Sequence, residues 1–180
     1  MNIGFDLDGI FIDKPPFVPR GLIERLYRGP QNHELKYRFP STRFEQEVRR
    51  FSHHSFLRPR ISRNIQFLNH FSKNPKNKIY LISSRFSFLK QRTEKVIQKY
   101  KFDKIFNGVF FNFEDRQPHI FKNEVIKKLK LDLFADDDLP LLNFLSEQNQ
   151  QVVFYWFNRD QKARLKKNLF AITQLSDILI

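Results

Sequence analysis

The 180-residue sequence predicts an α/β fold, a Rossmann-like, doubly wound and mostly parallel sheet. Two observations predict it. Short apolar runs of the kind found in buried strands occur at 2–6, 78–82, 108–113, 131–135 and 151–157, and amphipathic patterns of helical period lie between them. Such an alternation favours a parallel sheet that is covered by helices on both faces. Because ligands in these sheets bind beyond the carboxyl ends of the strands, the residues that follow each strand form the candidate site.

The first strand lies in the stretch NIGFDLDGIFID at 2–13, and Asp6, Asp8 and Gly9 follow it. Aspartate and glycine are ordinary turn residues, so the stretch alone also fits a strand that runs into a turn. Residues 14–60 are then predicted to be an insertion. The core domain is predicted to comprise residues 1–13 and 61–180.

The insertion is predicted to be a small, basic and mainly helical cap over the strand ends. It begins with the proline-rich segment KPPFVPR, and Thr42 and Glu45 have the spacing of a capping box that starts a helix reaching about Leu57. Between positions 14 and 63 there are twelve lysine or arginine residues and four glutamates. The cap is therefore either a solvated basic face or a surface that selects a polyanionic substrate. Its arginines include Arg20, Arg25, Arg28, Arg43, Arg49 and Arg50.

Apolar stripes at a spacing of three to four residues predict the remaining helices. The cap helix carries Phe44, Val48 and Phe51 on one stripe. The stripes of the core domain are interpreted as hydrophobic core, and they comprise Ile61, Ile65, Leu68 and Phe71, then Leu89, Thr93, Val96, Ile97 and Tyr100, and then Phe121, Val125, Ile126 and Leu129. Asp138, which is followed by Leu139 and Pro140, is interpreted as the N-cap of a further helix.

Composition narrows the class of protein. Hydrophobic residues at 41%, with 22 phenylalanines, supply a core, so disorder is not expected. The absence of cysteine excludes disulfides and thiolate metal sites and fits a reducing compartment. There is no apolar run of membrane-spanning length and no pattern of a secretory signal, so we expect a soluble cytoplasmic protein. The net charge of +13 favours phosphates, nucleic acids or anionic surfaces as partners without choosing among them.

Asp6 and Asp8 have the chemistry that cleavage of a phosphate monoester needs. Residues two apart in an extended strand point the same way. A carboxylate at Asp6 can attack phosphorus, form an aspartyl phosphate and be released by water, while a carboxyl group at Asp8 can protonate the leaving alkoxide. Because this attack brings two anions together, a divalent cation is needed, and the predicted cofactor is Mg²⁺.

Other strand ends supply the remaining groups. Ser83 is predicted to donate a hydrogen bond to a phosphoryl oxygen, and Lys122 is predicted to neutralise the charge on that oxygen. We expect Lys122 in the first turn of a helix, where a cation opposes the helix dipole but a bound anion is favoured. Asp136 and Asp137 follow the fourth strand and are predicted to complete the magnesium site.

These segments resemble the four ordered motifs of the haloacid dehalogenase (HAD) superfamily. The matching segments are FDLDG at 5–9, an apolar strand that ends in serine at 79–83, Lys122, and FADD at 134–137. The resemblance covers nearly the whole chain apart from the insertion, which lies where many members insert a cap. It implies a nucleophile at Asp6, an acid/base and main-chain magnesium ligand at Asp8, phosphate-binding residues at Ser83 and Lys122, and metal ligands at Asp136 and Asp137.

Within this superfamily, ISSR at 82–85 is similar to the 5'(3')-deoxyribonucleotidase-like branch. For Arg85, a surface ion pair is favoured over a phosphate clamp. His53 and His54 are adjacent and point to different sides of their helix, so structural or surface roles are favoured over metal binding. Tyr155 and Trp156 are interpreted as core or edge packing.

The predicted function is that of a HAD-like hydrolase, a magnesium-dependent phosphatase acting on a small phosphorylated metabolite or nucleotide. Two alternatives remain open. In one, the substrate is a terminal phosphate on DNA or RNA held by the basic cap. In the other, the chain is a nucleic-acid-binding protein that keeps the fold without catalysis. An enzyme is favoured because a nucleophile, an acid, a lysine and a metal pair occur on four separate segments.

Overall fold

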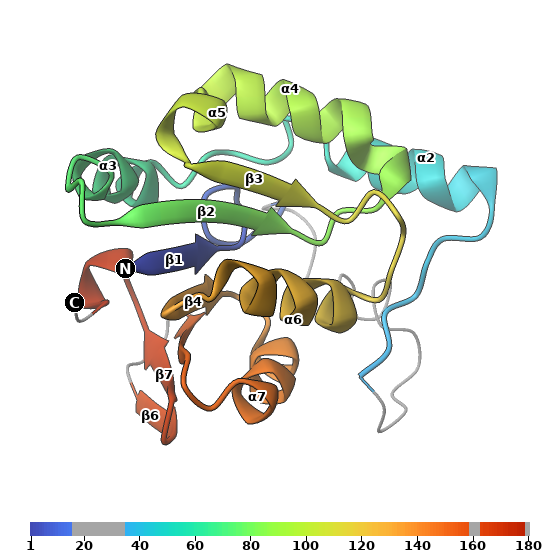
Figure 1. The fold of residues 1–180 in the computed structure, drawn as a ribbon. Coiled ribbons are helices and arrows are strands. Elements are labelled where there is room, and N and C mark those ends of the chain that lie inside the picture. Colours follow the sequence, from blue (N-terminus) through green and yellow to red (C-terminus); the bar gives the residue numbers. More distant parts are fainter. Residues whose placement is uncertain (16–34, 159–162, 179–180) are drawn as a thin grey trace.

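A computed structural model describes residues 1–15, 35–158 and 163–178 (Figure 1). Its described residues form a seven-stranded sheet in the order β3-β2-β1-β4-β5-β7-β6, in which every neighbouring pair is parallel except β6 with β7. The strands are β1 (Asn2–Phe5), β2 (Lys78–Ser83), β3 (Gly108–Phe111), β4 (Leu133–Asp136), β5 (Val153–Phe157), β6 (Ala163–Lys166) and β7 (Leu169–Ile172). The predicted doubly wound α/β fold and its five strands are confirmed.

The strands β6 and β7 are additions to the five predicted ones. They form an antiparallel hairpin, and β7 pairs parallel with β5, so the hairpin extends the sheet beyond β5. Each has only four residues. Arg164 and Lys166 place charge on the outermost strand, and this hinders pairing of the sheet edge with another chain.

Helices cover both faces of the sheet (Figure 1). On one face lie α3 (Ser62–Phe71), α4 (Lys90–Tyr100) and α5 (Phe102–Ile105), and on the other lie α6 (Pro118–Leu129) and α7 (Leu139–Gln148). There are also two short 3₁₀ helices: η1 (Ser87–Leu89) lies directly before α4, and η2 (Leu175–Asp177) follows β7.

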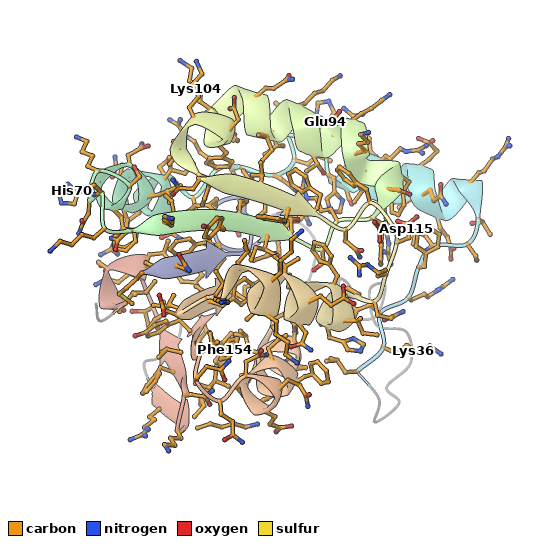
Figure 2. The ribbon with its side chains drawn as sticks, viewed as in Figure 1. Lys36, His70, Glu94, Lys104, Asp115 and Phe154 are labelled. Carbon is orange, nitrogen blue, oxygen red and sulfur yellow. The ribbon has the colours of Figure 1, made fainter. Side chains whose placement is uncertain are left out.

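Each face has its own hydrophobic cluster, because successive strand residues point to opposite faces. In β4, Ala135 packs on the side of α3 and α4, whereas Phe134 packs on the side of α6 and α7. Figure 2 shows the contrast between inside and outside: Phe154 of β5 lies within the molecule near α7, while His70, Glu94 and Lys104 project away from it.

The capping box predicted for the cap helix is present at the start of α2 (Arg43–Ser52), where Thr42 and Glu45 each accept from the other's backbone amide. The helix ends at Ser52, so the extension to Leu57 was wrong. His53 is the C-cap of the helix. Further along the chain, Pro59 disfavours helical angles at Arg58, the residue before it. Figure 1 shows α2 on the side toward which the arrowheads of β2 and β3 point, near the carboxyl ends of these strands.

The two ends of the predicted insertion lie side by side. The backbone amide of Asp13 donates to the carbonyl of Pro59 at 2.8 Å, and that of Ile61 donates to Phe11 at 2.8 Å. The division into a core and a cap at 14–60 stays a prediction. Most of the proline-rich segment, with Arg20, Arg25 and Arg28, lies outside the described residues.

Tyr37 attaches the described part of the cap to the helices α6 and α7. Its backbone amide donates to Gln117 Oε1 at 2.9 Å, and Gln117 Nε2 donates back to the Tyr37 carbonyl at 3.2 Å. The Tyr37 hydroxyl donates to Asp138 Oδ2 at 2.6 Å. Asp138 also caps α7 by accepting from the amide of Leu141, so its predicted N-cap role is confirmed.

The apolar stripe of α2 is exposed rather than packed. Phe44, Val48 and Phe51 are 78%, 48% and 69% exposed, respectively. The buried residue of this helix is Arg49. In α2 the apolar stripe therefore does not mark the side that packs on the core. None of the described helices is long and apolar enough to span a membrane.

Candidate active site

The candidate site is built where β1 and β4 end next to each other. Phe5 is in register with Ala135, and the amide of Asp6 donates to the Ala135 carbonyl at 2.9 Å. This places Asp6 beside Asp136, the last residue of β4. After Asp6 the chain turns tightly, and the Gly9 amide donates to the Ile12 carbonyl at 2.7 Å.

Gly9 is required by this turn and by Asp137. Its φ of +78° is rarely adopted by residues that have a side chain, and a Cβ atom there would overlap with the Asp137 carboxylate. We therefore expect Gly9→Ala to displace Asp137, to lower the free energy of unfolding by about 1–3 kcal/mol, and to weaken binding of Mg²⁺. Urea denaturation and calorimetric titration with Mg²⁺ measure the two effects. Gly108→Ala in β3 is the control, and equal losses of magnesium affinity in both variants would contradict this role of Gly9.

A buried lysine joins the two strand ends. Lys122 Nζ donates to Asp6 Oδ1 at 2.7 Å and to Asp136 Oδ2 at 2.6 Å. Lys122 is the fifth residue of α6, one turn deeper than predicted, because Pro118 starts that helix. Burial disfavours its charged form, but Asp136 and Asp6 more than offset this and hold the Lys122 pKa above its usual value. The lysine is thus protonated within the cluster.

A third carboxylate completes the group. Among the described residues, Asp6, Asp136 and Asp137 offer oxygens that all lie within 4.8 Å of one another. Burial raises the pKa of Asp6 and Asp137, and it raises the pKa of Asp136 to about 6. The positive charge of Lys122 lowers the pKa of Asp6 and Asp136 but does not cancel the effect of burial. Lys14 Nζ pairs with Asp137 at 2.6 Å. Hard carboxylate oxygens are the donors that Mg²⁺ prefers, so these three side chains fit a magnesium ion.

The Asp8 carboxylate is not one of these three and pairs with arginines instead. Arg85 donates two hydrogen bonds to it, from Nε to Oδ2 and from Nη2 to Oδ1, both at 2.7 Å. Arg58 Nη1 also donates to Asp8 Oδ1. Burial would raise the pKa of Asp8, but the guanidinium groups of Arg85 and Arg58 hold it well below its usual value. Asp8 is therefore ionised in this arrangement.

Arg85 is not the surface residue that the sequence favoured. Its side chain is buried, because the chain turns inward after β2 and places the guanidinium on Asp8. Ser83, the last residue of β2, is also buried. The next hydroxyl, Ser84 Oγ, is buried and has no hydrogen-bond partner among the described residues. A buried donor of this kind is costly, so Ser84 is a further hydroxyl available to a bound anion.

All of these groups line one cavity of about 360 Å³. The structure brings together the residues predicted for the site, namely Asp6, Asp8, Ser83, Lys122, Asp136 and Asp137. The cavity is also lined by Arg38, His53, Arg58 and Trp156, which sequence reasoning did not place there. It is lined as well by Arg49, one of the predicted cap arginines, and by Arg85, for which the phosphate clamp was the less favoured interpretation.

His53 and Trp156 are fixed in the cavity wall by hydrogen bonds to neighbouring backbone carbonyls. His53 is buried, and its Nδ1 lies 2.8 Å from the Arg49 carbonyl. Burial, together with Arg58 and Arg85, lowers the pKa of His53 well below its usual value. The Trp156 indole donates to the Asp137 carbonyl at 3.1 Å, so this residue supports the site as well as packing in β5.

The comparisons with known proteins agree with this fold. No family model matches the chain, and no curated protein matches its sequence. A protein described as a β-phosphoglucomutase from Thermotoga maritima matches with a TM-score of 0.63 and 14% identity over 99% of both chains. A HAD family enzyme from Bacteroides thetaiotaomicron, solved in complex with magnesium and inorganic phosphate, matches with a TM-score of 0.57 and 18% identity, over 89% of this chain and 95% of that one.

A chain of the Pnkp1/Rnl/Hen1 RNA repair complex also matches, with a TM-score of 0.51 and 15% identity over 87% of this chain and 42% of that one. These likenesses show the fold. The HAD-like fold implied by the sequence motifs is therefore confirmed, and the deoxyribonucleotidase-like branch stays a prediction.

Proposed function

We propose that this chain, which has the HAD-like fold, is a magnesium-dependent phosphatase that hydrolyses a phosphate monoester through an aspartyl phosphate on Asp6. The observation that carries the proposal is the convergence of Lys122 with Asp6 and Asp136, next to Asp137, at the carboxyl ends of β1 and β4. Three neighbouring carboxylates that share one buried lysine, Lys122, and the partly exposed Lys14 are costly for a structural element. The cost is reasonable where a cation and a phosphate bind.

In the proposed reaction, an Asp6 carboxylate oxygen attacks phosphorus and the bond from phosphorus to the ester oxygen breaks, which releases the alkoxide. Lys122 holds the carboxylate in place and offers charge to the phosphoryl oxygens. Ser83 donates a hydrogen bond to the same oxygens. Asp6, Asp136 and Asp137 would hold Mg²⁺, with the Asp8 main-chain carbonyl as a further ligand. The ion would neutralise charge between nucleophile and phosphate.

Asp8 is proposed to serve as the acid/base, and its surroundings favour the base role. With two guanidinium groups on it, Asp8 is ionised and suited to take a proton from the water that releases Asp6. A protonated Asp8 would supply the proton of the leaving alkoxide, and the two guanidinium groups oppose that form.

Magnesium is expected to stabilise the fold. An ion that binds only the folded chain raises the melting temperature as its concentration rises. We expect this shift in the natural protein and its loss in Asp136→Asn, both measured by thermal denaturation with and without Mg²⁺. The exposed Asp103 supplies the control, since Asp103→Asn should keep the shift. An undiminished shift in Asp136→Asn would place the ion elsewhere.

The activity itself is tested by phosphate release from p-nitrophenyl phosphate, sugar phosphates and nucleoside monophosphates, with Mg²⁺ and with EDTA. We expect release that depends on Mg²⁺. If nothing is released from this panel or from end-phosphorylated oligonucleotides, the phosphatase proposal fails.

A terminal phosphate on a nucleic acid is the second candidate substrate. The net charge of +13 supports it, as does the likeness to a chain of an RNA repair complex. The alternative of a non-catalytic nucleic-acid-binding protein has less support, because phosphate-backbone binding does not need buried carboxylates.

A further inference from the structure

We propose that the outward side of α2, with the aromatic residues between α2 and the cavity, is a binding surface for single-stranded nucleic acid. This α2 surface consists of Phe39, Arg43, Phe44, Val48, Arg50, Phe51 and Phe56. The inference deepens the second candidate substrate of the proposed function. It rests on that function only where the end of the strand is placed in the cavity.

Exposed apolar side chains are concentrated on the α2 surface. Eight large hydrophobic side chains are exposed among the described residues, and five of them lie between positions 39 and 56. Phe44 and Phe56 are 78% and 88% exposed, although burial of a phenylalanine is favourable. The other three exposed residues, Met1, Ile120 and Leu165, lie far apart in the sequence. A cluster of exposed apolar side chains is typical of an interaction site.

The helical repeat places two arginine–phenylalanine pairs on the same side of α2. Arg43 directly precedes Phe44, and seven residues later Arg50 directly precedes Phe51. Seven residues make nearly two turns, so the second pair lies in line with the first, about 10 Å further along the axis. Val48 lies between the two rings, because residues three and four apart are neighbours on a helix.

The segment that carries these pairs has a net positive charge. Residues 35–63 contain eight lysine or arginine residues and two glutamates, so these 29 residues contribute +6 to the total of +13. Glu47 lies on the same side of the helix and pairs with Arg50. Both glutamates are included in the net charge, which therefore favours an anionic partner without requiring any arginine to be unpaired.

Aromatic rings connect the α2 surface with the cavity. The ring of Phe39, which is 38% exposed, lies 5.1 Å from that of Phe86 and 5.9 Å from that of Phe88, between centroids. Phe86 lines the cavity. Arg50 Nε of α2 donates to the Phe88 carbonyl at 3.0 Å. A strand whose end enters the cavity can therefore continue over these rings onto α2.

A single strand fits this surface better than a membrane or a second copy of the chain. Each nucleotide combines a flat base with a phosphate, and each arginine–phenylalanine pair offers a partner to both. A helix that lies in a membrane surface needs a wide apolar side, whereas only three of the ten residues of α2 are apolar. A second copy would bring two positively charged segments together.

The test compares an oligothymidylate with an abasic strand of equal length, neither of which has a terminal phosphate. The natural protein in EDTA is titrated with each labelled strand, and fluorescence anisotropy measures the affinity. We expect the oligothymidylate to bind about tenfold more tightly than the abasic strand, because each stacked base contributes a factor of this order. Binding of both strands should weaken steeply as the salt concentration rises.

Variants of exposed residues assign the binding to α2. Phe44→Ala with Phe51→Ala should lower the affinity for the oligothymidylate about tenfold and leave that for the abasic strand nearly unchanged. Both rings are exposed, so the fold should persist. Ile120→Ala on α6 is the matched control and should bind as the natural protein does. Glu47→Gln should bind both strands more tightly, because it removes a negative charge beside the arginines.

Equal affinity for the two strands would overturn the inference, as would undiminished binding of the oligothymidylate by the double variant. It would also be overturned if the natural protein bound neither strand and Phe44 and Phe51 were instead needed for self-association or for binding to phosphatidylserine vesicles. The outcomes separate the inference from the proposed function. Base-dependent binding by a protein that releases no phosphate supports the α2 surface and removes the phosphatase. Release from nucleoside monophosphates without strand binding removes the α2 surface alone.

Discussion

Asp6→Asn is expected to reduce magnesium-dependent phosphate release by about 10⁴-fold or more, as removal of a covalent nucleophile does in other hydrolases. An amide oxygen cannot form the aspartyl phosphate. The fold should persist, because asparagine has the same shape and keeps an oxygen that can accept from Lys122. Lys122 then forms an ion pair with Asp136 alone. Stability should therefore be equal to or greater than that of the natural protein.

The measurement is phosphate release from the best substrate of the panel, with Mg²⁺ at saturation, together with a denaturation curve for each protein. Asp132→Asn is the matched control, because Asp132 precedes β4 and so lies at the opposite end of the sheet. Its activity should be close to that of the natural protein. Undiminished release in Asp6→Asn would mean that Asp6 is not the nucleophile.

Lys122→Met is expected to have the largest effect on stability, lowering the free energy of unfolding by about 3–5 kcal/mol at neutral pH. The substitution leaves Asp6 and Asp136 buried without their shared cation. Methionine fills a similar volume, so the loss is electrostatic rather than a cavity effect. Activity should also be lost, because the phosphoryl oxygens lose a cationic partner.

The deficit should shrink as the pH falls. Burial raises the pKa of Asp6 and Asp136 in the folded chain, and without Lys122 these values rise further. A carboxyl group whose pKa is raised by folding destabilises the fold at high pH and ceases to do so below its unfolded pKa, near 4. Urea denaturation in EDTA at pH 7 and at pH 5 should therefore show a smaller difference from the natural protein at pH 5.

Two further variants test whether the charge imbalance is the cause. Lys128→Met on the exposed side of α6 should change stability by no more than about 0.5 kcal/mol. The double variant Lys122→Met with Asp136→Asn should recover part of the loss, because it buries one carboxylate fewer. A Lys122→Met protein as stable as the natural one at pH 7 would contradict the ionic cluster.

The sheet and the carboxylates of the site are predictable from sequence because their signals are local. Each central strand is an apolar run, and a parallel sheet brings the residues after such runs to one edge. The same rule applied to Ser83 extends two residues further to Arg85, and this is the signal that points to its place in the site. The added hairpin differs: β6 contains Arg164 and Lys166 and is therefore not an apolar run, and the pairing of β7 with β5 depends on contacts outside the hairpin itself.

The cap residues of the site are a different case. Arg49, His53 and Arg58 come from a segment whose orientation is set by contacts distant in sequence, such as that between Tyr37 and Asp138. In the structure, the apolar stripe of α2 is exposed, and the buried residue of this helix is Arg49, on another side. Local periodicity therefore gave the helix but not its buried side, which only the tertiary packing reveals.

Trp156 is the one tryptophan of the chain, and its indole forms part of the cavity wall beside Asp137. Ultraviolet emission from tryptophan consequently originates at this wall alone. Binding of an ion or an ester in the cavity can therefore be followed by tryptophan fluorescence, without a label and without a substitution.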